Sequence, residues 1–391
     1  MLSAEHIAIV KATVPLLEAH GEVLTNHFYR LLLDKHPAMR SMFNNVRQAN
    51  GEQARALSHR LLHYARNIDR METLGPVIST ICSKHVSKYV QPEHYAMVGA
   101  CLIRTIRDVL GERTATDALI AAWSAAYAQF ASILVGAEFQ IYGGRERAPG
   151  GWRGLRPFVV VSRTMECREI VSLRLRPLDG GEVSQHVPGQ YIGLSVTIND
   201  EEFRRNYSLS SAANGHTYRI SVKREPGGRV SGYLHDHIGV GDVLSLYPPS
   251  GEFTLRDSDR PLALISAGVG ITPMMAMLEA GMRAGRAINF IHAARERAVH
   301  AFRQHVDDLA VSYPLMRRFY CYERVEADDA AAEGLLTRER LREWLPDTRQ
   351  LDVYVLGPLA FMRAVRVHLE AVGIPWTDVR YEFFGVASLM D

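Results

Sequence analysis

The chain has no strong excess of charge of either sign. Its 391 residues include 45 lysines and arginines against 43 acidic residues, which gives a formal net charge of +2. Basic runs with interleaved aromatic residues are absent, so the sequence gives no reason to expect nucleic acid or an anionic membrane as a partner. We therefore expect small molecules as its partners.

Long apolar runs and paired cysteines are also missing. No apolar stretch approaches the roughly 20 residues that a membrane span needs, and the first six residues lack the charged start and apolar core of a signal peptide. The cysteines form no CxxC pair, which argues against an iron–sulfur cluster or zinc knuckle. There are four: Cys82, Cys101, Cys167 and Cys321. We expect a cytoplasmic monomer with free thiols and no membrane span.

The composition, 47% hydrophobic and 23% charged, is typical of a globular protein, and the length suggests two or three domains. Residues 1–142 have apolar positions recurring near a period of 3.6, with a long helix expected from 115 to 142, so we predict an all-α domain. Residues 143–151 are rich in glycine and charge, and we predict a linker there.

The second half changes pattern twice. Short β segments at 158–161, 170–175, 191–196 and 218–222 predict an antiparallel β-barrel over residues 152–258. From residue 259 to 391, buried strands at 262–266, 288–292 and 352–357 alternate with helices. That alternation predicts an α/β domain with a parallel sheet.

Two short motifs in the barrel carry possible ligand chemistry. Arg205-Asn206-Tyr207-Ser208, downstream of Tyr191, offers a phosphate partner, a flat stacking face and a hydroxyl for a flavin. Taken alone, such a tetrapeptide is usually ordinary strand surface. The stretch 227–231 precedes a predicted helix over 232–237, so its backbone N–H groups could face a pyrophosphate, although a hairpin turn explains it about as well.

The third motif lies in the α/β domain, directly after a buried strand. Gly268 and Gly270 would let the backbone of the chain approach a dinucleotide closely, and Thr272-Pro273 opens the next helix. A lone GxG motif is weak evidence for a dinucleotide site. A GxGxTP motif that follows a strand and lies downstream of an RxYS motif is much more specific evidence.

The three motifs in this order resemble the ferredoxin-reductase-like flavoproteins over roughly residues 152–391. The resemblance implies FAD in the barrel domain, at Tyr191, Arg205, Asn206, Tyr207, Ser208, Gly228, Val230, Ser231, Phe383, Phe384, Gly385 and Val386. It implies NAD(P)H in the α/β domain, at Gly268, Val269, Gly270, Ile271, Thr272, Pro273, Gly357 and Pro358. The family places the residue at Phe384 beside the flavin ring.

Three positions depart from the family pattern. Leu356 and Phe383 stand where cysteine is common, and Val386 stands where proline is usual. We expect these changes to affect the rate of hydride transfer more than cofactor binding. The choice between NADH and NADPH stays open: the family favours NADH, but Arg295 and Arg297 follow a strand where they could bind a 2′-phosphate.

One histidine of the helical half lies in a position that is typical of a haem ligand. His85 follows the helical segment 73–84 and precedes Pro92, where a helix ends and the chain turns. Residues 1–142 resemble the globin domain of bacterial flavohaemoglobins. The runs that carry the resemblance are 10–17, 27–29, 42–44, 50–53, 84–85 and 91–95.

The resemblance implies haem b with His85 as the proximal ligand of the iron and with Tyr95 and Glu138 hydrogen-bonded beside it. On the other haem face, Tyr29 would donate to bound oxygen, helped by Gln53. Phe43, Leu57 and Lys84 would line the haem pocket. Without the family, Glu138 would be better explained as a solvated helix residue and Tyr29 as a buried aromatic residue with a satisfied hydroxyl.

This combination predicts a nitric oxide dioxygenase, which converts NO and O₂ to nitrate with electrons from NAD(P)H through FAD. Two alternatives stay open. The haem could relay electrons to another acceptor, or the protein could bind oxygen or nitric oxide as a sensor.

Overall fold

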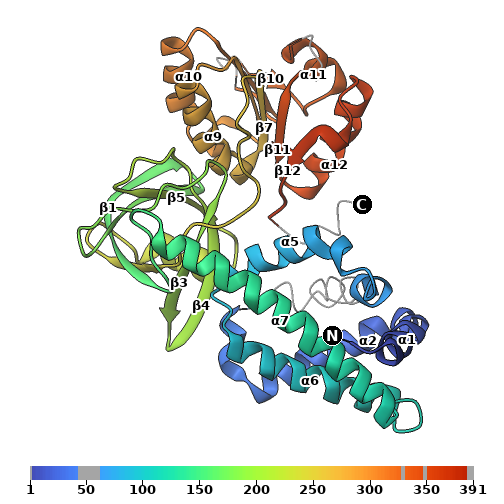
Figure 1. The fold of residues 1–391 in the computed structure, drawn as a ribbon. Coiled ribbons are helices and arrows are strands. Elements are labelled where there is room, and N and C mark those ends of the chain that lie inside the picture. Colours follow the sequence, from blue (N-terminus) through green and yellow to red (C-terminus); the bar gives the residue numbers. More distant parts are fainter. Residues whose placement is uncertain (1, 43–61, 327–330, 347–349, 385–391) are drawn as a thin grey trace. The chain divides into compact units, whose positions relative to one another are not determined.

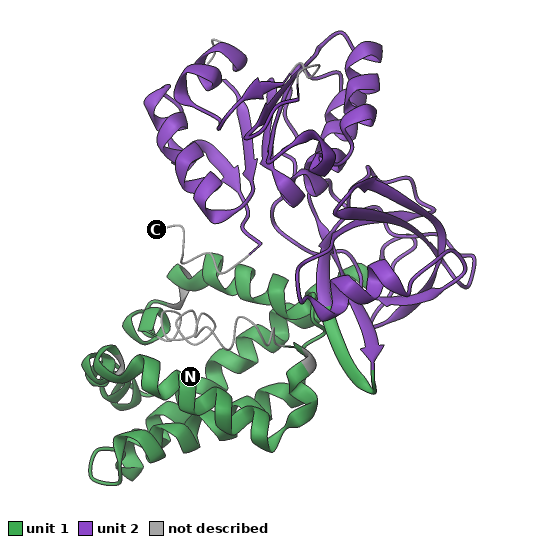
Figure 2. Ribbon diagram, turned by 180° about the vertical axis from the view of Figure 1, so that it is seen from behind, with its two compact units in different colours: residues 1–147, 199–204 green, residues 148–198, 205–391 purple. Residues whose placement is uncertain are grey.

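The computed structural model describes residues 2–42, 62–326, 331–346 and 350–384. The chain divides into two compact units, shown in green and purple in Figure 2. The first comprises residues 1–147 with 199–204, and the second comprises 148–198 with 205–391. All four cysteines are free thiols, as predicted.

The first unit is helical, as the periodicity predicts (Figure 1). Its described elements are α1 (Ala4–Ala12), α2 (Val14–Lys35), η1 (Pro37–Met42), η2 (Met71–Leu74), α5 (Gly75–Val86), α6 (Pro92–Leu110) and α7 (Asp117–Arg147). Local sequence explains the helix starts. Ser3 accepts a hydrogen bond from the backbone N–H of His6, and prolines occupy the first turns of α2, α5 and α6.

Helix α7 contradicts the expectation that no apolar stretch of the chain approaches 20 residues. Residues 118–137 carry no charge, and by length and composition alone α7 could cross a membrane. About 28% of its apolar stretch is buried inside the unit, including Leu119, Ala122, Trp123 and Ala126. Trp123 is 2% exposed and donates its indole N–H to Thr13 Oγ1 over 3.1 Å, and Tyr64 donates to the carbonyl oxygen of Ala126.

The predicted linker 143–151 begins too early, because α7 continues to Arg147. Two glycines inside a helix cost about 1 kcal/mol each relative to alanine. Tertiary contacts outweigh that cost: Tyr142 is buried and donates its hydroxyl to the carbonyl oxygen of Val90 over 2.9 Å. The domain boundaries at 142, 151 and 258 stay predictions.

The strands that follow α7 form the predicted antiparallel sheet, which belongs to the second unit except for residues 201–204 of one strand. The strands are β1 (Arg156–Cys167), β2 (Ile170–Pro177), β3 (Tyr191–Ile198), β4 (Glu201–Ser208), β5 (Tyr218–Lys223) and β6 (Val243–Leu246), in the order β4-β3-β6-β1-β2-β5. A bridge between Leu209 and Ile220 joins the chain after β4 to β5, so the two ends of the sheet meet and the barrel closes. Helix α8 (Arg229–Asp236) follows β5.

The remainder of the unit is a parallel sheet with helices on both faces (Figure 1). Its strands are β7 (Leu262–Ala267), β8 (Ile288–Ala294), β9 (Met316–Tyr322), β10 (Ala332–Glu333), β11 (Asp352–Leu356) and β12 (Val379–Tyr381), in the order β10-β9-β8-β7-β11-β12. Helices α9 (Ile271–Arg283) and α10 (Arg303–Ser312) cover one face, and α11 (Arg338–Trp344) and α12 (Leu359–Ala371) cover the other. The strand order reverses at β7, where such sheets bind ligands.

A buried ion pair lies at the start of these strands. Arg286 donates to Asp352 Oδ2 over 2.6 Å, and both side chains are at most 2% exposed. Arg286 also donates from Nε to the carbonyl oxygen of Arg260 over 2.8 Å. Because both charges are desolvated, removing Arg286 would leave Asp352 with only the partly exposed Arg256, 3.5 Å away, as a cationic partner.

We expect Arg286→Met to lower the free energy of unfolding of this domain by about 3–5 kcal/mol, because Asp352 would lose its buried partner. Calorimetry of the full-length protein would measure the effect. Arg338→Met, at an exposed pair with Glu339, is the control and should change little. Equal stability of the Arg286→Met variant would contradict the assignment.

Candidate functional site

Three helices of the first unit bring His85, Tyr95 and Glu138 together. His85 lies in the last turn of α5, Tyr95 in the first turns of α6, and Glu138 in the second half of α7. His85 Nδ1 lies 2.8 Å from Glu138 Oε1 and 2.9 Å from the Tyr95 hydroxyl, and that hydroxyl donates to Glu138 Oε1 over 2.6 Å. The three side chains therefore form a closed hydrogen-bonded triangle.

Glu138 is only 3% exposed, so its interpretation as a solvated helix residue is wrong. A buried carboxylate needs donors, and here the Tyr95 hydroxyl and the imidazole supply them. Since a carboxylate accepts hydrogen bonds, it holds the imidazole proton on Nδ1. The Nε2 lone pair of His85 is then left to bind a metal, as a proximal haem ligand requires.

Tyr95 is held in its neutral, donating form. Burial, and then the hydrogen bond to Glu138, raise the pKa of its hydroxyl above the ordinary value. Tyr127 on α7 donates its own hydroxyl to the backbone oxygen of Tyr95 over 2.6 Å and fixes the start of α6. Sequence reasoning missed Tyr127. The available signal is its spacing of 11 residues from Glu138, three helical turns along one face.

The other side of the predicted haem pocket is described only in part. Tyr29 lies on α2, half-buried, with its ring edge-to-face against Phe28 at a centroid distance of 5.2 Å. Lys84 is exposed on α5. Phe43, Gln53 and Leu57 lie outside the described residues. The assignment of these five residues to the pocket stays a prediction.

The predicted flavin residues follow β3, β4 and α8. Tyr191 begins β3, and a Cβ on Gly251 would meet its ring at 2.9 Å, so glycine lets this ring pack against the backbone. Along β4, Arg205 and Tyr207 are half-buried, Asn206 is exposed and Ser208 is buried.

The stretch around Gly227 is both a turn and a helix start. Gly227 has a φ of +69°, which favours glycine, and Gly228 is the N-cap of α8. Val230 is buried and Ser231 accepts from the backbone N–H of Glu225. The expected helix begins at Arg229 rather than residue 232.

The two predicted dinucleotide segments lie at the carboxyl ends of adjacent parallel strands, β7 and β11. Gly268 to Gly270 form a 3₁₀ turn between β7 and α9, and Gly357-Pro358 follow β11. A Cβ on Gly270 would lie 2.3 Å from the carbonyl oxygen of Leu356, so the two segments pack backbone to backbone. The helix within the motif begins at Ile271, and Val269, Thr272 and Pro273 lie in this same turn and helix start.

The C-terminal segment follows β12, the strand beside β11. Phe383 is half-buried and Phe384 is 41% exposed. Gly385 and Val386 lie outside the described residues. Of the two arginines proposed for a 2′-phosphate, Arg295 is ion-paired with Glu169, and Arg297 is exposed.

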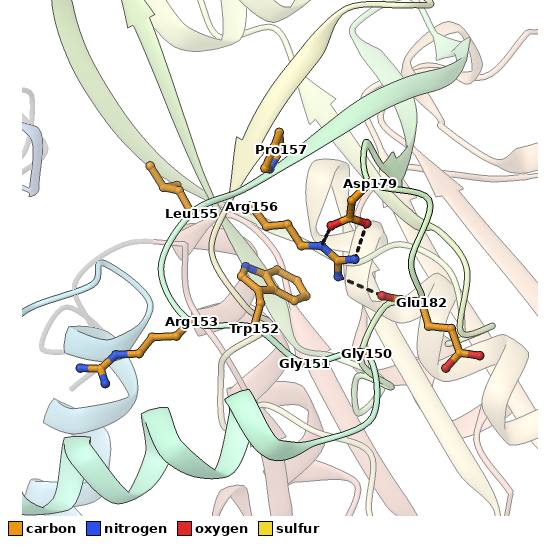
Figure 3. Close-up of a pocket in the computed structure, with 9 residues that line it drawn as sticks. All are labelled: Gly150, Gly151, Trp152, Arg153, Leu155, Arg156, Pro157, Asp179 and Glu182. Atoms are coloured by element: carbon orange, nitrogen blue, oxygen red, sulfur yellow. Dashed lines mark hydrogen bonds and ion pairs between the residues drawn. The ribbon is translucent and has the colours of Figure 1, made fainter.

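A separate hollow of about 600 Å³ lies at the start of the barrel domain (Figure 3). Arg156, which lines this hollow, already has hydrogen-bond partners within the protein. Arg156 donates to both carboxylate oxygens of Asp179 over 2.7 and 2.8 Å, and to the backbone oxygen of Glu182 over 2.9 Å. The lining contains none of the residues predicted to bind a cofactor.

We expect Gly270→Ala to slow reduction of the flavin by NADH about a hundredfold, because the new Cβ must push the glycine turn away from Leu356. Gly144→Ala is the matched control, because Gly144 lies within helix α7, its φ is not positive, and a Cβ there would meet open space. Stopped-flow absorbance would measure both. Equal rates in the two variants would argue against the close approach.

Comparison with known proteins now assigns the parts of the chain. Three family models match: Globin over residues 26–134, Oxidoreductase FAD-binding domain over 157–255, and Oxidoreductase NAD-binding domain over 264–367. The flavohemoproteins of Burkholderia sp. (strain TH2) and Pseudomonas putida are 56% and 54% identical to this chain, each over the full length of both proteins.

Solved structures agree with this division. The flavohemoglobin of Malassezia yamatoensis, with bound FAD and heme, is similar with a TM-score of 0.85 and 27% identity, covering 98% of this chain and 100% of that one. The FAD/NAD-binding domain of a nitric oxide dioxygenase from Vibrio cholerae matches 59% of this chain and 98% of its own, with a TM-score of 0.56 and 38% identity. Together with the His85–Tyr95–Glu138 triangle and the paired glycine turns, these matches show that the chain belongs to the flavohaemoproteins, oxidoreductases that use haem, FAD and a nicotinamide dinucleotide.

Proposed function

We propose that this protein is a nitric oxide dioxygenase, which converts NO and O₂ to nitrate with electrons from NAD(P)H. The observation that carries the proposal is the buried carboxylate of Glu138 on the Nδ1 side of His85. A carboxylate in that position increases the basicity of a ligating imidazole. More electron density then reaches the metal, which favours oxygen activation over simple oxygen storage.

The bound groups supply the redox chemistry: FAD accepts a hydride and releases single electrons, and haem binds and activates oxygen. The reaction balances with two NO and two O₂ per NAD(P)H. The products are two nitrate ions, one NAD(P)⁺ and one proton. The protein must therefore hold the imidazole, donate hydrogen bonds to oxygen, and position the two dinucleotides.

On the proximal side, Glu138 orients the imidazole of His85 and Tyr95 keeps Glu138 in place. Because the Tyr95 hydroxyl donates to the same oxygen, Oε1, the carboxylate is fixed from two directions. Its burial keeps competing water away, so the interaction is stronger than it would be at the surface.

On the distal side, we assign Tyr29 as the donor to oxygen in the pocket. Oxygen activated for this reaction would carry partial negative charge, and a hydrogen bond from Tyr29 to a charged acceptor is worth about 1.5–3 kcal/mol. Tyr29 lies half-buried on α2, with its ring against that of Phe28.

In the second unit, the glycine turns at the ends of β7 and β11 would accept the nicotinamide dinucleotide. The N-terminus of α9 follows Gly270 directly, and helix N-termini favour phosphate groups. The Vibrio cholerae relative, which carries nitric oxide dioxygenase in its name, shares 38% identity with this half of the chain and supports the proposal.

We expect Tyr29→Phe to lower NO consumption about 10- to 100-fold, because oxygen would lose its charge-assisted hydrogen bond. An NO electrode and a nitrate assay would measure the loss. NADH-driven reduction of ferricyanide is the internal control and should be unchanged. Unaffected NO consumption would count against Tyr29, and NADH oxidation by the unaltered protein without nitrate would favour electron transfer to another acceptor.

We expect Glu138→Gln to lower nitrate formation about 10- to 100-fold, because the imidazole loses its anionic acceptor. The iron–histidine stretching frequency in resonance Raman spectra should fall with it. Glu93→Gln, at an exposed position in the first turn of α6, is the matched control. An unchanged frequency in Glu138→Gln would exclude the proposed role.

A further inference from the structure

A cluster of residues around an arginine–glutamate pair connects the barrel to the α/β domain within the second unit. We call it the Glu279 cluster, and it consists of Ser210, Ala212, Arg219, Glu279 and Phe302. Glu279 lies on α9, whereas Arg219 lies on β5 of the barrel. The cluster lies outside both glycine turns of the predicted dinucleotide site.

Glu279 uses both carboxylate oxygens to hold the barrel. Oε2 accepts the backbone N–H of Ala212 over 2.8 Å, and Oε1 lies 3.5 Å from the guanidinium of Arg219. His305 Nε2 lies 3.8 Å from the same Oε1. Burial would raise the pKa of Glu279, but these partners outweigh it and lower the pKa overall, so the side chain is held as a carboxylate.

Arg219 is held equally firmly from the barrel side. Its Nε donates to the backbone oxygen and to the hydroxyl of Ser210 over 3.1 and 3.2 Å. Its guanidinium stacks on the ring of Phe302, 5.0 Å from the centroid. Phe302 has a left-handed φ of +61°, an unfavourable backbone for a large side chain, which the surrounding packing maintains.

The cluster joins the two chain segments that lead to the two cofactors. Ser210 comes two residues after Ser208, the end of the predicted flavin strand. Glu279 lies on the helix that begins directly after Gly270. Arg283, one turn further along α9, donates to the backbone oxygen of Ala213 over 3.1 Å and adds a second connection.

Hydride transfer is the step that needs this connection. Donor and acceptor atoms must approach to about 3–3.5 Å, and a misplacement of about 1 Å can cost a hundredfold in rate. In this chain the two cofactors are bound by different domains. A small rotation of α9 relative to the barrel would therefore alter the distance between nicotinamide and flavin.

We propose that Glu279 is a positioning residue for hydride transfer, which fixes the nicotinamide-binding helix against the flavin-binding strand through Arg219 and the backbone of Ala212. The inference depends on the FAD and NAD(P)H assignment. It is independent of the chemistry proposed at the haem, because it concerns the step that precedes electron transfer to that group.

The test uses the full-length holoprotein with Glu279→Gln, which keeps size and one acceptor but removes the charge. In anaerobic stopped-flow experiments with NADH, the limiting rate of flavin reduction should fall about tenfold, while the dissociation constant for NADH changes less than twofold. The isotope effect with NADH deuterated at the transferred position should increase. Arg219→Lys keeps the positive charge, but a lysine ammonium cannot donate to Ser210 and face Glu279 at the same time as the guanidinium does. This variant should therefore show a smaller change in the same direction.

Glu370→Gln is the matched control, since Glu370 is an exposed partner of Arg366 on α12. Unchanged reduction rate and isotope effect in Glu279→Gln would overturn the proposal, even if the melting temperature falls. If Glu279→Gln does not fold, Arg219→Lys decides by the same two readouts. Photochemically reduced Glu279→Gln should still form nitrate at the normal single-turnover rate. A loss there would also contradict a role confined to hydride transfer.

Discussion

The hydrogen bond between the Glu138 carboxylate and the His85 imidazole is the constraint on which the helical unit depends. The two residues are 53 positions apart, and a carboxylate that is 3% exposed is stable only with donors around it. Tyr95 supplies one donor from α6, and Tyr127 in turn fixes the backbone of Tyr95. Three helices must therefore pack in one arrangement before His85 can present Nε2 to a metal.

The predicted dinucleotide site of the second unit depends on the close approach of two backbone segments. Gly270 and Leu356 belong to neighbouring parallel strand ends, and their backbones approach so closely that no side chain fits at Gly270. Gly357 is similar, because a Cβ there would lie 2.5 Å from the ring of Phe361. The N-terminus of α9 lies at the carboxyl end of β7, where the strand order reverses, and dinucleotide phosphates are generally stabilised at such positions.

The sequence predicted these two arrangements with unequal success, for a physical reason. The GxGxTP turn is local, so its strand, glycines and helix are adjacent in the chain, and the structure confirms their order. The triangle around His85 comes from three distant helices, and residue types alone favoured a solvated Glu138; only the family resemblance brought the three together. The linker prediction failed at residues 143–147 because a tertiary contact of Tyr142 extends α7. Nothing local distinguished Glu279 from a surface glutamate.

Two carboxylates, the buried Glu138 and the partly exposed Glu279, thus have different roles in this chain. Glu138 accepts from an imidazole and a hydroxyl, so its charge is directed at one ligand and changes the electron density of that ligand. Glu279 accepts from a backbone N–H and faces an arginine, so its charge connects two pieces of backbone and changes their spacing. In both cases the desolvation cost is offset by at least two partners, which also restrict the orientation of the carboxylate. The same physical requirement, donors for a desolvated charge, therefore underlies the proposed tuning of His85 in one unit and the proposed alignment of two domains in the other.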